Sequence, residues 1–128
     1  MSEITTNVDW IAVAAGTLVS FLLGWLWYSP MLFGKKWAAG IGVDLGSASS
    51  MPVAAMVAQL VATFLLAWVV GVTAAQNALM TVILIVITLV FFIVSNGLFG
   101  KKSHAAITIE AGFIVAMAVI MIIAQAIF

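Results

Sequence analysis

Four long apolar runs, separated by short polar or glycine-rich breaks, constrain the fold of this 128-residue chain more than any other feature. A helix needs about 20 apolar residues to cross the hydrocarbon core of a bilayer, and each run reaches that length. Backbone groups in hydrocarbon must satisfy their own hydrogen bonds, so we read every run as a helix. The sequence predicts an all-α membrane protein, one domain over residues 1–128, with four transmembrane helices at about 10–33, 52–73, 79–99 and 105–127.

Composition excludes several classes of protein. Hydrophobic residues make up 66% of the chain and charged residues 6%, whereas soluble domains are about half apolar and a quarter charged. A net charge of zero provides no basic surface for nucleic acid. Cysteine is absent and the one histidine, His104, reads best as a helix-start residue, so a metal site within one subunit lacks ligands. No nucleophile, base and orienting acid lie together, and we expect neither an enzyme nor a cofactor.

All four basic residues fall in two copies of one short lysine motif, SPMLFGKKW at 29–37 and SNGLFGKKS at 95–103. At an offset of 66 residues, six positions match, which pair Ser29, Leu32, Phe33, Gly34, Lys35 and Lys36 with Ser95, Leu98, Phe99, Gly100, Lys101 and Lys102. The offset contains two spans, so duplication predicts two parallel two-helix repeats, 10–75 and 79–128, related by a twofold axis along the membrane normal. The alternative is two independent helix ends that each use glycine as a stop and lysine as an anchor.

The positions of the lysines predict the topology. Lys35 and Lys36 follow the first span, and Lys101 and Lys102 follow the third, so both pairs lie on one face of the membrane. Cytoplasmic loops carry an excess of lysine and arginine, so we expect both pairs to be anchors at the cytoplasmic face of the cell (inner) membrane. Both termini then lie outside, in agreement with the acidic, lysine-free tail before Trp10.

Pro30 predicts a break at the end of the first span. Proline removes a backbone donor and biases Ser29 away from helical geometry. The helix should therefore kink or stop near Tyr28 and restart as a short interfacial turn through Trp37. Deep aromatic residues such as Trp27 and Tyr28 are more typical of core packing than of a ligand pocket.

The same stretch resembles the signature of a known family. The residues that carry the resemblance are Gly24, Trp27-Tyr28-Ser29-Pro30, Phe33-Gly34 and Trp37, in the pattern G-x-x-W-Y-S-P-x-x-F-G-x-x-W. The family consists of small bacterial four-span membrane proteins of unknown function. The resemblance implies four spans and a cell-membrane location, and it carries no activity over to this chain.

Glu110 is the acidic residue that falls inside a predicted span. It lies about six residues into the fourth span, roughly 9 Å deep at 1.5 Å per residue. A charge at that depth is costly, so Glu110 should face the bundle or water. In one interpretation it pairs with a lysine near the same interface or with hydroxyls of a neighbouring helix. In the other it is a protonatable or cation-binding carboxylate.

The spans also contain uncharged polar residues. Thr81, Thr88 and Ser95 recur every seventh residue and so share one stripe of the third span, while Gln59 and Thr63 lie in the second. Such groups either line a wet path or hydrogen-bond across helix contacts, and we favour the packing seam.

Two functions fit these features. The favoured hypothesis is a homo-oligomer in the lipid bilayer that provides a path for a small ion or solute, with Glu110 setting its charge preference. The alternative is a structural or accessory subunit of a larger membrane complex, without transport activity. We expect a homo-oligomer because four short spans with small-residue faces offer more contact surface than one bundle uses.

Overall fold

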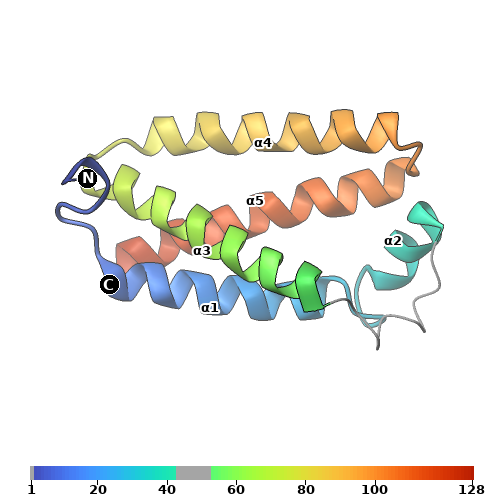
Figure 1. Cartoon of the computed structure of the whole chain (residues 1–128), viewed down its shortest axis with the longest axis horizontal. Helices are drawn as coiled ribbons and strands as arrows, with labels where there is room; N and C mark the ends of the chain where they lie inside the picture. Colours follow the sequence, from blue (N-terminus) through green and yellow to red (C-terminus); the bar gives the residue numbers. More distant parts are fainter. Residues whose placement is uncertain (1, 43–52) are drawn as a thin grey trace.

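The computed structural model describes residues 2–42 and 53–128 (Figure 1). Within these ranges the chain forms a short 3-10 helix, η1 (Ser2–Ile4), and the α-helices α1 (Trp10–Trp27), α2 (Gly34–Ile41), α3 (Val53–Ala75), α4 (Leu79–Phe99) and α5 (His104–Ile127). Four of these helices, α1, α3, α4 and α5, are long and apolar enough to cross a membrane. The prediction of an all-helical, multi-pass membrane protein is therefore confirmed.

The predicted spans agree closely with three of the long helices. α4 covers residues 79–99 as predicted, α5 begins one residue early at His104, and α3 continues two residues further to Ala75. Pro52, where the second span was predicted to begin, lies outside the described residues.

The first span is shorter than predicted. Its predicted end at residue 33 is wrong, because α1 ends at Trp27 and the chain restarts as α2 at Gly34. Pro30 lies in the turn between the two helices, where its fixed ring geometry and missing N–H are tolerated. The predicted stop near Tyr28 is confirmed, since Tyr28 caps the end of α1.

Side-chain caps and left-handed residues set the other helix boundaries. The Asp9 carboxylate accepts a hydrogen bond from the Ala12 N–H at 3.1 Å, and Ser103 Oγ accepts one in the first turn of α5 at 3.0 Å. Each cap satisfies a backbone donor that a helix start leaves free. Asn77 and Lys101 adopt left-handed backbone conformations, with φ of 54° and 58°, and turn the chain between the last three helices.

α5 is the central helix of the bundle and contacts α1, α3 and α4. α4 lies along one edge, and α3 crosses the face formed by α1 and α5 (Figure 1). η1 and the end of α5 lie at one end of the bundle, which we call the terminal end. α2 and the α4–α5 turn lie at the opposite end, which we call the α2 end (Figure 1).

Small residues on one face of α1 allow it to approach α5 closely. A Cβ atom at Gly16 would lie 3.3 Å from Met121 Cγ, and one at Gly24 would lie 3.1 Å from the ring of Phe113. Ser20 lies between them on the same face and is 0% exposed. Its hydroxyl has no hydrogen-bond partner among the described residues. Glycine and serine at every fourth position are typical of close helix contacts in membranes.

The centre of the bundle is apolar. The buried residues that form one contiguous cluster come from α1, α3, α4, α5 and the segment before α1, and they are Val8, Val13, Ala67, Val70, Val82, Phe113, Met117 and Met121. These side chains form the close-packed apolar core of the described bundle.

The two copies of the lysine motif have different local structures. In the first copy, residues 29–33 form a turn and Gly34 begins α2, whereas residues 95–99 of the second copy are the last turn of α4. Pro30 accounts for the difference, because Asn96 at the matching position permits the helix to continue. The parallel two-helix repeat remains a prediction.

Candidate functional site

The turn between α1 and α2 is closed by hydrogen bonds of its own residues. The Phe33 N–H donates to the Trp27 carbonyl at 3.1 Å and the Gly34 N–H to the Ser29 carbonyl at 2.9 Å. Ser29 Oγ donates to the carbonyl of Leu26 at 2.7 Å. These bonds satisfy backbone groups at the end of α1 and direct the chain back toward α5.

Gly34 is required by the closeness of this turn. A Cβ atom at this position would lie 2.7 Å from the Ser29 carbonyl oxygen and would overlap the carbonyl oxygen of Tyr28. Both atoms belong to the backbone and cannot rotate away. The glycine of the sequence motif is therefore a packing requirement of the turn.

Trp27 ties the end of α1 to α5. Its indole Nε1 donates a hydrogen bond to the Ile109 carbonyl oxygen at 3.0 Å. Its ring packs against Phe33 and Phe113, with ring centroids 4.8 Å and 6.0 Å away. Buried tryptophan commonly combines ring packing with one hydrogen bond of this kind.

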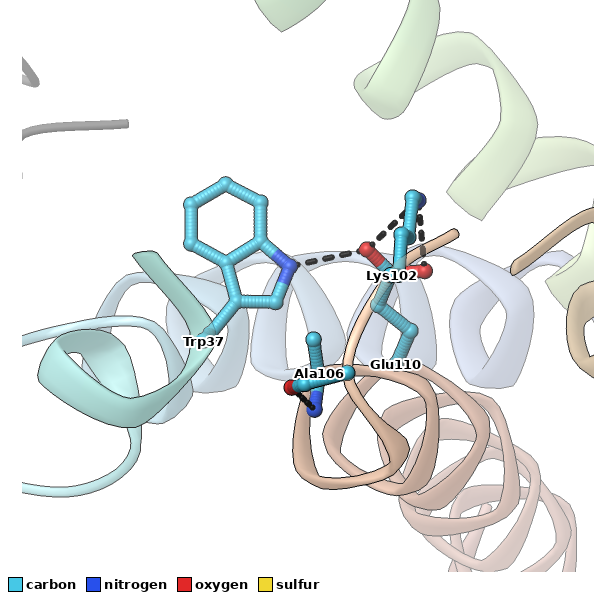
Figure 2. Close-up of polar contacts among 5 residues, drawn as sticks. Trp37, Lys102, Ala106 and Glu110 are labelled. Atoms are coloured by element: carbon cyan, nitrogen blue, oxygen red, sulfur yellow. Dashed lines mark hydrogen bonds and ion pairs between the residues drawn. The ribbon is translucent and has the colours of Figure 1, made fainter. Parts of the chain in front are cut away.

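Glu110 lies at the centre of a cluster of polar contacts at the start of α5 (Figure 2). Its Oε2 accepts a hydrogen bond from Trp37 Nε1 at 2.8 Å, and both carboxylate oxygens lie 3.0 Å from Lys102 Nζ. The Glu110 and Lys102 side chains are 18% and 34% exposed. We call Trp37, Lys102 and Glu110 the Glu110 cluster. This ion pair agrees with the first of the two interpretations of Glu110, in which a lysine near the interface neutralises it.

Tyr28 packs beside the Glu110 cluster. Its ring meets Trp37 and Phe113 edge-on, at centroid distances of 5.1 Å and 5.4 Å. Burial raises the pKa of the Tyr28 phenol above its usual value, and the negative charge of Glu110 raises it further. Tyr28 is therefore a neutral side chain throughout the physiological pH range.

α2 is fastened to the start of α5 by its small residues as well as by Trp37. The Ser103 N–H donates to the Gly40 carbonyl at 3.0 Å. A Cβ atom at Gly40 would lie 2.6 Å from that of Ala106 and would overlap Ser103 Oγ. Ala38 is 2% exposed. The short helix α2 thus packs against the start of α5 at the α2 end of the bundle.

Docking of α2 brings both lysine pairs to the same end of the bundle (Figure 1). Lys35 and Lys36 lie in the first turn of α2, and Lys101 and Lys102 lie in the α4–α5 turn. Lys102 is engaged by Glu110, whereas Lys35, Lys36 and Lys101 are exposed.

The uncharged polar residues predicted for a seam or path lie elsewhere. Thr81, Thr88 and Ser95 are all exposed on α4, and Thr88 Oγ1 donates to its own helix, at the Leu84 carbonyl, over 2.9 Å. In α3, Gln59 is exposed and Thr63 is buried, and the Thr63 hydroxyl donates to the Gln59 carbonyl at 2.7 Å.

These side chains do not converge on Glu110. The residues of α4 that are buried, Val82 and Gly97, face the other helices, so the stripe of hydroxyls faces outward from the bundle. The hydroxyl stripe of α4 and the Glu110 cluster are therefore two separate features of the molecule.

A cleft also lies among the described residues, away from the Glu110 cluster. A shallow, open cleft of ≈ 320 Å³ lies at the terminal end, where the α3–α4 turn meets α5, and its polar lining residues are Thr73, Asn77 and Gln125. No charged side chain lines it. Residues 2–42 and 53–128 also contain no group of three His, Cys, Asp or Glu side chains that could hold a metal ion. The Glu110 cluster is the more specific candidate.

Sequence reasoning did not find the contacts of Trp37 and Trp27 with α5. The Trp37–Glu110 bond joins residues 73 positions apart, and the Trp27–Ile109 bond spans 82. The small residues beside Trp37, Ala38 and Gly40, were the available signal, because they mark a face of α2 that can approach another helix.

Comparison with known proteins yields a family. No match was found among curated proteins or among solved structures. A family model described as Protein of unknown function (DUF1761) matches residues 11–125. This match agrees with the resemblance to a family of unknown function, while the motif as a signature and a bacterial origin stay predictions. The chain belongs to the DUF1761 family.

Proposed function

We propose that this protein is a structural, non-enzymatic subunit that assembles laterally in the cell membrane with copies of itself. The observation that carries the proposal is the outward-facing stripe of Thr81, Thr88 and Ser95 on α4. α4 is the least buried of the four candidate spans. A polar stripe on a lipid-facing helix gains hydrogen bonds when a second helix covers it, worth about 0.6 to 2 kcal/mol each.

The packing of the single bundle supports a structural role over transport within one subunit. Phe113, Met117 and Met121 of the central helix are 4%, 2% and 1% exposed and fill the interior. Glu110, which would set the charge preference of a path, is paired with Lys102. A neutralised carboxylate is a poor attractant for cations, because its charge is already compensated.

A second candidate is a path formed between copies. The same α4 stripe favours it, because hydroxyls spaced seven residues apart would face one another around an oligomer axis. In this case the stripe lines a wet passage for a small ion or solute instead of a dry seam. A larger membrane complex is a further possible partner for the same face.

Cross-linking tests the assembly face. The chain lacks cysteine, so Thr88→Cys introduces a single thiol on the stripe, and Leu18→Cys introduces one on an exposed position of α1. We expect oxidation in membranes to yield covalent dimers of Thr88→Cys and few of Leu18→Cys. Equal cross-linking of both variants, or a monomer by native mass spectrometry in lipid discs, would contradict the proposal.

Flux measurements separate the two candidates. Liposomes that contain the assembled wild-type protein should show no ion or solute flux if the role is structural. Flux that disappears in a Thr81→Val, Thr88→Val, Ser95→Ala variant that still assembles would instead establish the path between copies. A change in flux in the Glu110→Gln variant would show that Glu110 contributes to the path.

We also propose that the α2 end faces the cytoplasm, that both termini lie outside, and that the two halves are parallel. The excess of lysine at the α2 end supports this orientation. In intact cells, an impermeant thiol reagent should label Glu3→Cys and leave Lys36→Cys and Lys101→Cys unlabelled. Labelling of Lys36→Cys and Lys101→Cys from opposite sides would exclude parallel halves.

A further inference from the structure

We propose that the α2 end of the bundle binds the headgroups of anionic phospholipids through Lys35, Lys36 and Lys101. The ligand chemistry is a phosphate diester at a membrane surface. The site is an exposed basic rim that contacts several headgroups, and it does not depend on the assembly face proposed above.

The first support is the distribution of charge. Lys102 is neutralised by Glu110 at 3.0 Å, so three lysines of the α2 end have no carboxylate partner among the described residues. The terminal end carries acidic side chains, Glu3 and Asp9, in place of basic ones. Among the described residues, charge is therefore polarised along the axis of the bundle, and the basic end complements an anionic leaflet.

The second support is how the fold gathers the lysines. The Ser103–Gly40 hydrogen bond at 3.0 Å holds α2 beside the α4–α5 turn, so lysines that lie 66 positions apart in the sequence share one end of the molecule. Lys101 occupies a left-handed position with φ of 58°. Glycine or asparagine is usual at such a helix end, so the sequence places a charged side chain where the backbone does not favour one.

The third support is the apolar segment next to the lysines. Met31, Leu32 and Phe33 are 83%, 46% and 36% exposed, and Gly34 alone separates them from Lys35 and Lys36. In a bilayer these side chains enter the acyl-chain boundary while the lysines extend toward headgroups. An exposed apolar segment followed by paired lysines is suited to a lipid surface, and a soluble phosphate compound would use only the lysines.

Native mass spectrometry of the full chain tests the proposal. The protein is released from discs that contain equal amounts of phosphatidylglycerol and phosphatidylcholine, and the retained lipids are counted. Wild type should retain phosphatidylglycerol preferentially. Each lysine near an anionic leaflet strengthens binding by roughly fivefold, so the Lys35→Gln, Lys36→Gln, Lys101→Gln variant should lose this preference by roughly a hundredfold.

Matched variants make the result decisive. Glu3→Gln raises the net charge at the terminal end and should leave the preference unchanged, and arginine at the three lysine positions should preserve it. Free inorganic phosphate should not displace the lipid, since a soluble anion lacks the acyl contacts. Equal retention of both lipids by wild type, or a preference that survives the glutamine variant, would overturn the proposal. So would displacement by phosphate, which would indicate a site for a soluble anion.

Discussion

The indole N–H of Trp37 donates a hydrogen bond to the carboxylate of Glu110 at 2.8 Å, across 73 positions of sequence. The bond joins the short amphipathic helix α2 to α5, the central helix of the bundle. Lys102 Nζ donates hydrogen bonds to both oxygens of the same carboxylate at 3.0 Å. An intramembrane carboxylate that looks like an ion-binding group is thus engaged in holding α2 in place. The contacts of Glu110 therefore join α2 and the α4–α5 turn to α5.

Removal of the indole donor should loosen α2 without unfolding the bundle. Trp37→Phe keeps the ring contact with Tyr28 and deletes the bond to Glu110. A hydrogen bond to a charged group contributes about 1.5–3 kcal/mol, so the free energy required to open α2 should fall by a comparable amount. Hydrogen exchange at residues 34–41 measures the opening. Trp25→Phe, at a residue that is 64% exposed, is the control, and equal exchange in both variants would show that the bond does not hold α2.

The Lys102–Glu110 pair should behave as a coupled unit. Loss of one partner leaves the other charge partly buried without compensation, which is more costly than loss of both. We expect Lys102→Gln and Glu110→Gln to destabilise the protein singly, and the double variant to cost less than their sum, with a coupling of about 0.5–3 kcal/mol. Unfolding in mixed micelles measures the three values. Strict additivity would mean that the two side chains do not interact in the bilayer.

Tyr28 should resist ionisation. Burial and the Glu110 carboxylate raise its pKa above the usual 10.0, so the folded protein keeps a proton that the unfolded chain loses above that pH. Stability is then fully present below pH 10.0 and falls as the pH rises beyond it. The chain contains one tyrosine, so tyrosinate absorbance reports Tyr28 alone. A native protein that titrates at the same pH as the denatured one would refute the buried environment. Glu110→Gln should lower the native midpoint.

Gly34 should tolerate no side chain, whereas Gly112 should tolerate a methyl group. A Cβ atom at position 34 would lie 2.7 Å from a backbone oxygen of Ser29, but at position 112 the nearest atom is Trp27 Cζ2 at 3.4 Å. We expect Gly34→Ala to cost about 1–3 kcal/mol through displacement of the turn. Gly112→Ala should be neutral or stabilising by up to about 1 kcal/mol, because 3.4 Å is an ordinary van der Waals distance and alanine favours the helix over glycine by about 1 kcal/mol. Thermal unfolding in detergent compares them, and similar melting temperatures would contradict the turn geometry.

The features that the sequence reveals are those set by local chemistry. α4 has its predicted bounds because its apolar run is flanked by residues that turn the chain, and Pro30 marks the end of α1 because proline acts on its immediate neighbours. The inward faces of the spans were not predictable, since nearly every face of a transmembrane helix is apolar and periodicity loses its meaning. The outward position of the Thr81, Thr88 and Ser95 stripe and the reach of Trp37 to Glu110 depend on how the helices pack.

Ser20 offers a test of the α1–α5 packing itself. Its side chain is 0% exposed and its hydroxyl has no partner among the described residues, and an unsatisfied buried polar group costs about 1–3 kcal/mol. Ser20→Ala removes the hydroxyl and should leave stability unchanged or raise it by about 1 kcal/mol. Ser20→Val adds volume between helices that approach closely at Gly16 and Gly24 and should cost about 1–3 kcal/mol.

Tryptophan fluorescence during unfolding in mixed micelles measures both Ser20 variants against wild type. If Ser20→Ala destabilised the protein by more than about 1 kcal/mol, the hydroxyl would have a hydrogen-bond partner in the membrane, and α1 would sit rotated or shifted against α5 from the arrangement described above.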